Sequence, residues 1–599
     1  MEATTPTVNV GARRSVALAF VLGALFVVTV VAVDPRGLVP SGPLRWTATL
    51  ALMGAAVCTL LLQPVMGNPR RIPRIPQTAG NPRRIPQQWV AWLWVGLLLW
   101  LFLASVFGAD ALHAWIGTPD RRMGWLAWLT FPLMYLCGQA LTSELDRRIV
   151  LRGAAIAAGI LGVWCVFERA GWSLIDESFA GHRVGGPFGQ PAYVGAIAVL
   201  LAPLSAGVAF DRAGSRAWRV VGAAGAIGAT AALLLAQTRG AWFGIVVALV
   251  LLGSRHSAVA RRRWREIGLV AAAIVVLFAV TPLGGRAAGA FDLGHGTTRG
   301  RFDDWAVGAR VVEHDPFIGV GPEGYRVVFP RVVSERYVRC YGTDVIPDRA
   351  HNGIIDVATS GGVVAGLLYA ALLVLLLVAA WRSMRGRDPL TLALACAAVA
   401  YIVQQQFLFP LSEIDPLFWV VAGMLVASRA AGPARERRVN RAIPAVIAVL
   451  VLFGVVMGTR EVLADRLLER AATEPGATGL HDADRATRLR PDSIRTWYVA
   501  ARIAARGETI TDVDAAVKRV ERGLRQSPRD PALRVLHADL LVQRALRSGL
   551  DDDRARAEAV VDGYIADAPH EARLQRDRLA LDSTRSSTRA VRPAAPEKS

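Results

Sequence analysis

Hydrophobic runs follow one another along the first 460 residues of the chain. A run of about 18 or more apolar residues is long enough to cross a membrane as a helix. Apolar runs lie near residues 15–33, 46–62, 89–107, 123–142, 149–168, 191–210, 218–236, 241–253, 266–283, 363–381, 390–408, 415–428 and 443–459. Two of these, 241–253 and 415–428, are short for a span, so the pattern predicts about 12–13 transmembrane helices. The expected fold is all-α, a polytopic membrane helix bundle in residues 1–460.

One long polar interval, residues 284–362, interrupts this succession. The other connections are short, and those on alternate sides of the bundle differ in arginine content. The richer set includes the connections at 70–84, 255–265 and 429–441. Short loops rich in Lys and Arg remain on the cytoplasmic side. We therefore expect a cytoplasmic N-terminus, a large extracytoplasmic loop at 284–362 and an extracytoplasmic C-terminal tail.

From residue 461 the sequence becomes charged and rich in alanine, and no further hydrophobic run follows. Segments 488–491 (Arg-Leu-Arg-Pro) and 525–528 (Arg-Gln-Ser-Pro) recur at an offset of 37 residues. This spacing is near that of helix-pair repeats of the tetratricopeptide type. We expect a TPR-like helical domain at 461–581, which could bind a protein partner. Residues 582–599 are rich in Ser, Arg and Pro and are expected to be disordered.

Composition narrows the class of protein further. A chain of 599 residues that is 53% hydrophobic is too long and too apolar to be one soluble domain. The net charge of +20 would suggest a nucleic-acid partner, but the positive residues fall in short loops, so no nucleic acid is expected. Nearly all of them are Arg, which favours the GC-rich genome of a bacterium. Together with the hydrophobic runs, this predicts a protein of the bacterial plasma membrane. No Cys or His spacing suggests a metal site, and no cofactor is expected.

Ionisable residues are scarce inside the predicted spans. Transporters and pumps carry such residues there, because these groups are costly in the membrane unless they function. The main polar cluster within a span is glutamines 404–406. We therefore expect any reaction to occur at the outer face, where the polar interval, Arg183, Arg239 and Arg301 can converge.

Four motifs carry a family resemblance. They are Thr-Arg-Gly-Ala-Trp at 238–242, Gly-Arg followed by Trp at 300–305, His-Asp-Pro-Phe-Ile-Gly-Val-Gly at 314–321, and Ala-His-Asn at 350–352 with Gly362 beyond it. In order and position they resemble the O-antigen ligase and polymerase superfamily over roughly residues 90–430. The resemblance implies a GT-C-like bundle that transfers a glycan from a polyprenyl diphosphate carrier to an acceptor hydroxyl at the extracytoplasmic face. Such transfer inverts the anomeric centre and needs no nucleotide sugar or metal.

The acceptor remains open, since a glycan, a lipid or a protein would each fit the family. Ligation of a finished glycan and polymerisation of lipid-linked repeat units are both compatible with the motifs. A transporter or flippase for the same lipid-linked glycan would need a charged central cavity, and the span interiors offer little to build one. A third reading is a scaffold that recruits partners through its helical tail.

The motif residues suit this chemistry. A diphosphate leaves more readily when guanidinium groups neutralise its developing charge, and Arg239 and Arg301 are the candidates, with Arg183 as a further substrate-binding residue. His351 is the candidate base for the acceptor hydroxyl, and Asn352 could orient that histidine or the sugar.

Each assignment has a structural alternative. His351 could cap the helix that follows it, and Arg239 could be an interfacial residue that reaches for the headgroups. Arg301 could form a surface ion pair with Asp303 or Asp304.

Overall fold

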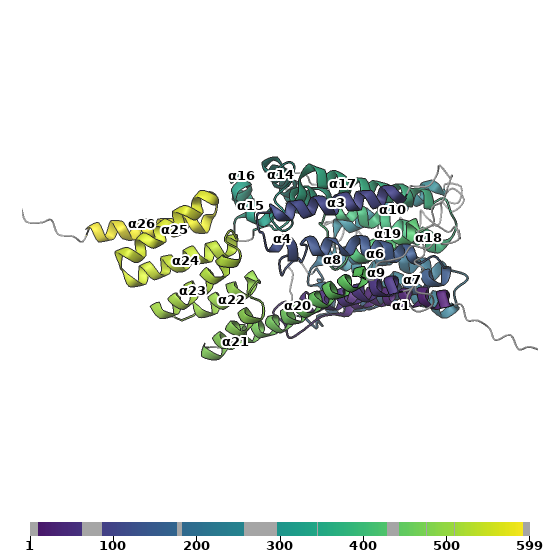
Figure 1. Cartoon of the computed structure of the whole chain (residues 1–599), viewed down its shortest axis with the longest axis horizontal. Coiled ribbons are helices and arrows are strands. Elements are labelled where there is room, and N and C mark those ends of the chain that lie inside the picture. The colour runs from purple at the N-terminus through teal and green to yellow at the C-terminus, as the bar shows by residue number, and fades with distance from the viewer. Residues whose placement is uncertain are drawn as a thin grey trace, which may run out of the picture.

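The computed structural model describes residues 10–62, 87–175, 183–256, 296–343, 346–427, 442–474, 476–507 and 509–590. All regular secondary structure in these ranges is helical, and seven helices are long and apolar enough to span a membrane. Shorter apolar helices accompany them at Ser15–Val31, Pro389–Gln405 and Asp415–Val426. The predicted all-α membrane helix bundle is therefore confirmed (Figure 1).

The helices of the bundle follow the hydrophobic runs closely. They are α1 (Val10–Val31), α2 (Pro43–Leu62), α3 (Gln87–Val106), α4 (His113–Ile116), α5 (Trp125–Trp128), α6 (Thr130–Ala140), α7 (Glu144–Arg169), η1 (Gly186–Phe188), α8 (Pro191–Phe210), α9 (Arg216–Ala236), α10 (Arg239–Arg255), α17 (Gly353–Ser383), α18 (Pro389–Gln405), α19 (Asp415–Val426) and α20 (Ala442–Thr473). The expected run at 266–283 lies outside the described residues.

The run at 123–142 departs from the expected single helix. It forms α5 and α6, with Leu129 between them. Pro132 explains the interruption, because a proline has no N–H for the carbonyl of residue 128 and its ring clashes with that carbonyl.

Helices in the bundle pack closely where small residues face each other. A Cβ atom added to Gly162 of α7 would lie 2.3 Å from the Cα of Gly228 in α9, so the two backbones are nearly in contact there. Small residues permit this approach between membrane helices.

The described part of the long polar interval is a helical subdomain. It contains α14 (Gly296–His314), α15 (Tyr325–Val332) and α16 (Glu335–Tyr341) around a small apolar core. The buried members of that core include Val307, Val311, Tyr325 and Phe329. Residues 284–295, the expected start of this loop, lie outside the described residues.

Helix α17 is interrupted near its beginning, at residues 361–362. Segment 316–321 of the polar interval packs against this interruption. Gly362 has φ +68°, a conformation that favours glycine. The segment 316–321 fits into the break: Val320 N–H donates to the Thr359 carbonyl at 2.9 Å, and Val363 N–H donates to the Pro316 carbonyl at 2.8 Å. Trp100 of α3 donates from Nε1 to the Gly361 carbonyl at 2.7 Å. These bonds fix the end of the short helix 353–360.

Helix α20 leads out of the bundle into the C-terminal tail, which forms α21 (Gly476–Leu489), α22 (Ile494–Ala504), α23 (Ile510–Gln526), α24 (Pro531–Ser548), α25 (Asp551–Asp567) and α26 (Ala572–Ala590). The tail stands at the end of the bundle where α14–α16 lie (Figure 1). The topology prediction requires this, because it assigns both segments to one face. The tetratricopeptide-like reading of the tail and its orientation relative to the cytoplasm remain predictions.

The boundary expected at residue 582 differs from the structure. Helix α26 continues to Ala590, and Leu574 and Leu581 bury their side chains in the tail core. These two leucines lie seven positions apart and so face the same side of this otherwise polar helix. Residues 591–599 lie outside the described residues.

Candidate functional site

His351 lies in the turn that precedes α17. Its backbone is left-handed, with φ +54°, and Trp305 Nε1 donates to its carbonyl at 3.1 Å. The imidazole lies beside the ring of Phe409, with centroids 5.3 Å apart. Its Nδ1 is buried and, among the described residues, has no hydrogen-bond partner. A buried polar atom without a partner is costly, so this nitrogen is a candidate contact for a ligand.

The cap of α17 is Asn352 rather than His351. The amide oxygen of Asn352 accepts from the N–H groups of Ile354 and Ile355 at 3.0 and 3.1 Å. Its Nδ2 donates to the Gln406 carbonyl at 3.1 Å. The capping alternative for His351 is therefore wrong, and the polar atoms of Asn352 are engaged with backbone groups.

Burial lowers the pKa of His351 to about 3, and the guanidinium of Arg301 adds to this shift. Asp348 opposes it, while Arg121 and Arg349 act in the same direction as Arg301. The imidazole is consequently neutral near pH 7, and a neutral imidazole has a lone pair that can accept a proton.

Arg301 projects from α14, next to Trp305. Its Nη1 lies 3.6 Å from Asp304 Oδ2, and its side chain is 33% exposed. Asp304 also accepts from the Tyr337 hydroxyl at 2.8 Å, so it is shared between two partners. The ion pair considered as an alternative role for Arg301 thus forms with Asp304, while the side chain remains accessible.

Arg239 begins α10, and the next residue sets how closely this helix approaches α18. A Cβ atom on Gly240 would lie 2.6 Å from Gln404 Oε1 and 2.8 Å from the Cβ of Phe407. The Phe407 ring lies 6.1 Å from the Trp305 ring. The glycine therefore brings Arg239 next to the turn that also contacts α14.

Arg183 lies beside the α9–α10 junction. Its Nε donates to the Ala236 carbonyl at 3.1 Å, and Thr238 Oγ1 donates to the Pro191 carbonyl at 2.9 Å. The loop that carries Arg183 is fixed by Glu168, whose carboxylate accepts from the N–H groups of Gly185 and Gly186, both at 2.7 Å.

The turn at 404–409 joins the predicted site residues. Gln404 and Phe407 contact the start of α10, Gln406 binds Asn352, and Phe409 packs on His351. Gly240, which follows Arg239, Trp305, which lies one helical turn after Arg301, and His351 itself therefore all adjoin this turn. Arg183 is linked to this group only through the α9–α10 junction.

The sequence reasoning missed three charged residues beside His351, namely Arg121, Asp348 and Arg349, and it also missed Glu323, which pairs with Arg349. Arg349 Nη2 lies 2.9 Å from Glu323 Oε2, and both side chains are almost fully buried. Burial alone would raise the pKa of Asp348, but Arg121 overcomes this and holds that pKa well below its usual range. Asp348 and Arg349 adjoin the His351 motif, and this proximity was the available signal.

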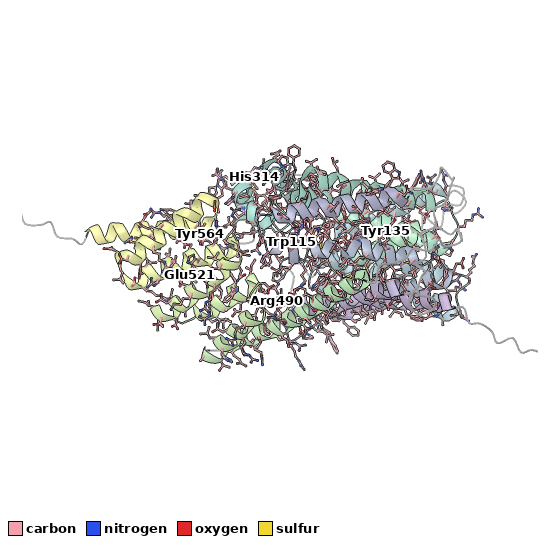
Figure 2. The ribbon with its side chains drawn as sticks, viewed as in Figure 1. Trp115, Tyr135, His314, Arg490, Glu521 and Tyr564 are labelled. Carbon is pink, nitrogen blue, oxygen red and sulfur yellow. The ribbon has the colours of Figure 1, made fainter. Side chains whose placement is uncertain are left out.

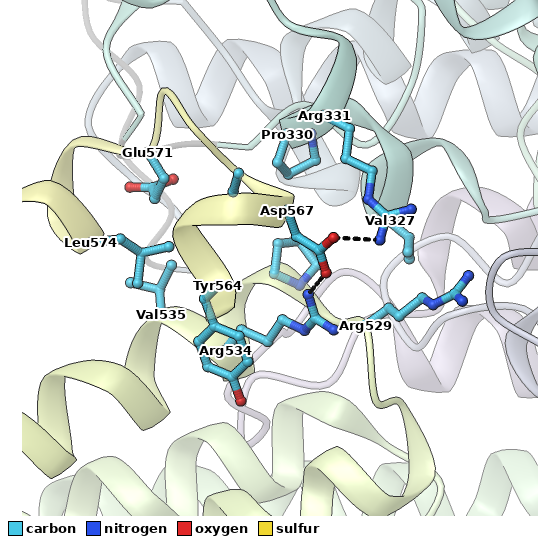
Figure 3. A pocket seen from close by; sticks show the side chains of 12 residues that line it. Val327, Pro330, Arg331, Arg529, Arg534, Val535, Tyr564, Asp567, Glu571 and Leu574 are labelled. Atoms are coloured by element: carbon cyan, nitrogen blue, oxygen red, sulfur yellow. Dashed lines mark hydrogen bonds and ion pairs between the residues drawn. The ribbon is translucent and has the colours of Figure 1, made fainter. Parts of the chain in front are cut away.

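A pocket with an empty volume of about 400 Å³ lies apart from these residues, between α15 and helices α24–α26. Figure 3 shows Asp567 in it between Arg331 of α15 and Arg534 of α24, at 2.8 and 2.6 Å. Within the part of the chain that the structure describes, no three His, Cys, Asp or Glu side chains converge as a metal site would require.

In a comparison with protein families, residues 224–370 fit the family model described as O-antigen ligase. The match includes Arg239, Arg301 and His351. The comparison with curated proteins finds no match to the chain.

Proposed function

Because residues 224–370 of this chain belong to the O-antigen ligase family, we propose that the protein transfers a glycan from a polyprenyl diphosphate carrier to an acceptor hydroxyl. The family is one of membrane glycosyltransferases of the ligase and polymerase type. The donor would lie in the membrane beside the bundle, with its diphosphate at the level of the headgroups. The transfer takes place on the extracytoplasmic face of a bacterial plasma membrane.

The single observation that carries the proposal is the environment of His351. This imidazole is neutral, has a buried Nδ1 that no described residue contacts by a hydrogen bond, and lies near the arginine of the second motif. Nδ1 accepts the proton of the acceptor hydroxyl while the hydroxyl oxygen attacks the anomeric carbon. The bond from that carbon to the diphosphate oxygen breaks, and its electron pair stays with the diphosphate.

Arg301 and Arg239 stabilise the leaving diphosphate, and Arg183 contributes from the α9–α10 junction. Their guanidinium groups neutralise charge that develops as the bond breaks. Attack from the side opposite the diphosphate inverts the anomeric centre. The same anion favours protonation of His351, because it offsets the positive charge that lowers the pKa of that residue.

The test compares two histidines of the same region. His351→Ala should lower transfer from a polyprenyl diphosphate-linked glycan at least about 100-fold, the usual contribution of a general base. His314 is the matched control, since its side chain is 50% exposed at the end of α14 (Figure 2). His314→Ala should keep normal activity in the same reconstituted membranes. Full activity in His351→Ala would remove this residue from the mechanism.

Ligase and polymerase activities differ in the acceptor. The same purified protein is offered either a second lipid-linked repeat unit or a glycan-free acceptor. A polymerase would join the glycan to the repeat unit, whereas a ligase would join it to the glycan-free acceptor.

A further inference from the structure

Arg121 makes three kinds of contact beside the His351 turn. Its Nε pairs with Asp348 Oδ2, its Nη2 donates to Asp348 Oδ1 at 3.3 Å, and its Nη1 donates to the Tyr193 hydroxyl. Its guanidinium carbon also lies 5.0 Å from the centre of the Phe409 ring. All three nitrogens of this arginine are therefore occupied by protein partners.

Phe409 connects Arg121 to His351. The buried ring of Phe409 has the His351 ring 5.3 Å away and the Arg349 guanidinium 5.9 Å away. Asp348, the partner of Arg121, begins the same turn that ends at His351. The turn is thus held at Asp348 by an ion pair and at His351 by an aromatic ring, and Arg121 contacts both supports.

The turn needs this support because of its backbone. His351 has φ +54°, which costs a non-glycine residue free energy unless the surroundings impose it. A planar guanidinium that contacts both carboxylate oxygens fixes the orientation of the carboxylate as well as its distance from the arginine.

We propose that Arg121 is a positioning residue for the transfer reaction, acting through Asp348 and Phe409 to hold His351 in its strained conformation. The inference rests on the proposed role of His351. Each of its guanidinium nitrogens contacts Asp348 or Tyr193, so we assign Arg121 to the support of the turn and not to the diphosphate. A displacement of about 1 Å at a reacting group can lower a rate about 100-fold, so the loss of Arg121 should reduce turnover.

The neighbours of Arg121 connect this support to the C-terminal tail. Asp120 pairs with Arg495 of α22, and Arg122 Nη2 donates to Glu461 of α20 at 2.7 Å. Arg122 itself has a left-handed backbone, with φ +54°. The tail and the His351 turn are therefore joined by residues 120–122.

The experiment measures turnover and donor KM in purified, reconstituted variants. Arg121→Ala should lower kcat about 10- to 100-fold while the donor KM stays within about twofold, because uniform binding is unaffected. Arg121→Lys keeps the charge but loses the planar fork, and should recover part of kcat. Arg339→Ala is the matched control, because Arg339 also pairs with a carboxylate but is 73% exposed on α16. It should behave as the unmodified protein.

Two milder variants keep the test decisive if Arg121→Ala fails to fold. Tyr193→Phe removes one hydroxyl, and Asp348→Asn removes one charge; each should lower kcat severalfold with little change in donor KM. Normal kcat in both folded variants would overturn the proposal, as would an Arg121 variant that raises only KM. If His351→Ala is inactive while these variants are fully active, the proposed function stands and the positioning role falls. Full activity of His351→Ala would instead refute the proposed function.

Discussion

At the scale of single residues, the environment of His351 decides its protonation. Burial and Arg301 hold its pKa at about 3, whereas an unfolded chain would have an ordinary histidine pKa near about 6.5. Below pH 6.5 the unfolded chain binds a proton that the folded protein does not. This residue therefore favours the folded state above pH 6.5, and that contribution is lost as the pH falls from about 6.5 towards 3.

His351→Gln should remove this pH dependence. Between pH 6.5 and pH 5, the unmodified protein should lose up to about 2 kcal/mol more unfolding free energy than the variant, at about 1.36 kcal/mol per pH unit. Thermal unfolding of the two proteins in the same detergent, at both pH values, measures the difference. Equal losses of unfolding free energy in the two proteins would show that the pKa of His351 is not lowered by burial as the structure indicates.

The sequence proposes His351, Arg239 and Arg301 through motifs that keep a recognisable order, and their roles remain predictions. It could not reveal Arg121, which counted only as one of the loop arginines. The proposed role of Arg121 depends on its ion pair with Asp348, more than 200 positions away in the chain. A single sequence does not show that pairing. The sequence also does not show that the side-chain oxygen of Asn352 caps helix α17.

At the scale of elements, Gly240 sets the distance between α10 and α18. Gly240→Ala should displace the start of α10, because the new Cβ would lie within 3 Å of Gln404 and Phe407. We expect transfer activity to fall about tenfold or more as Arg239 moves. The comparison is an activity assay of the membrane-reconstituted variant with Gly253→Ala beside it.

Gly253 is the control, since it belongs to the same helix and a Cβ there meets no atom of the other described residues within 4 Å. Gly253→Ala should keep full activity and gain up to about 1 kcal/mol of helix stability. If both alanine variants were equally active, close approach at Gly240 would not matter.

Elements were the most predictable level of the structure. Most apolar runs match a helix of the bundle within a few residues, because a span must be apolar along its whole length. Helix α17 begins well before its run at 363–381, and α20 ends well beyond its run at 443–459. The interruption by Pro132 and the break of α17 at Gly362 depend on local backbone chemistry that hydrophobicity does not report.

At the scale of the whole molecule, the tail docks on the bundle through a buried histidine. His113 Nδ1 lies 2.9 Å from Asp110 Oδ2, and its Nε2 lies 3.1 Å from the Asp492 carbonyl in the tail. Ser527 lies 3.2 Å from both His113 Nδ1 and Asp110 Oδ2. Burial alone would lower the pKa of His113, but the hydrogen bond and charge of Asp110, aided by Glu323, raise it.

A histidine whose pKa is raised on folding stabilises the folded state below about pH 6.5, and this is lost as the pH rises through the raised value. The tail should therefore be released more readily at alkaline pH. Limited proteolysis at pH 6 and pH 9 should show faster cleavage within α21–α23 at pH 9, relative to a protease standard. His113→Gln should weaken this dependence, and His314→Gln should leave it intact. An unchanged ratio in His113→Gln would contradict the assignment.

Domain placement could not be predicted beyond the expectation that loop and tail share one face. Docking involves pairs such as Arg326–Asp530 at 3.0 Å and the buried Arg490, which lies where the tail meets the bundle (Figure 2). In the sequence these residues look like any other charged positions of a polar domain.

The hydrogen bonds that seat segment 316–321 in the break of α17 all involve main-chain groups of that segment. A main-chain contact does not depend on which side chain the residue carries, except where a Cβ would not fit, as at Gly319 and Gly362. Exposed side chains of this segment, such as Phe317, can accordingly be replaced without loss of these main-chain hydrogen bonds. Substitutions at Phe317 should therefore alter the outer surface of the segment while the backbone geometry beneath it stays constant.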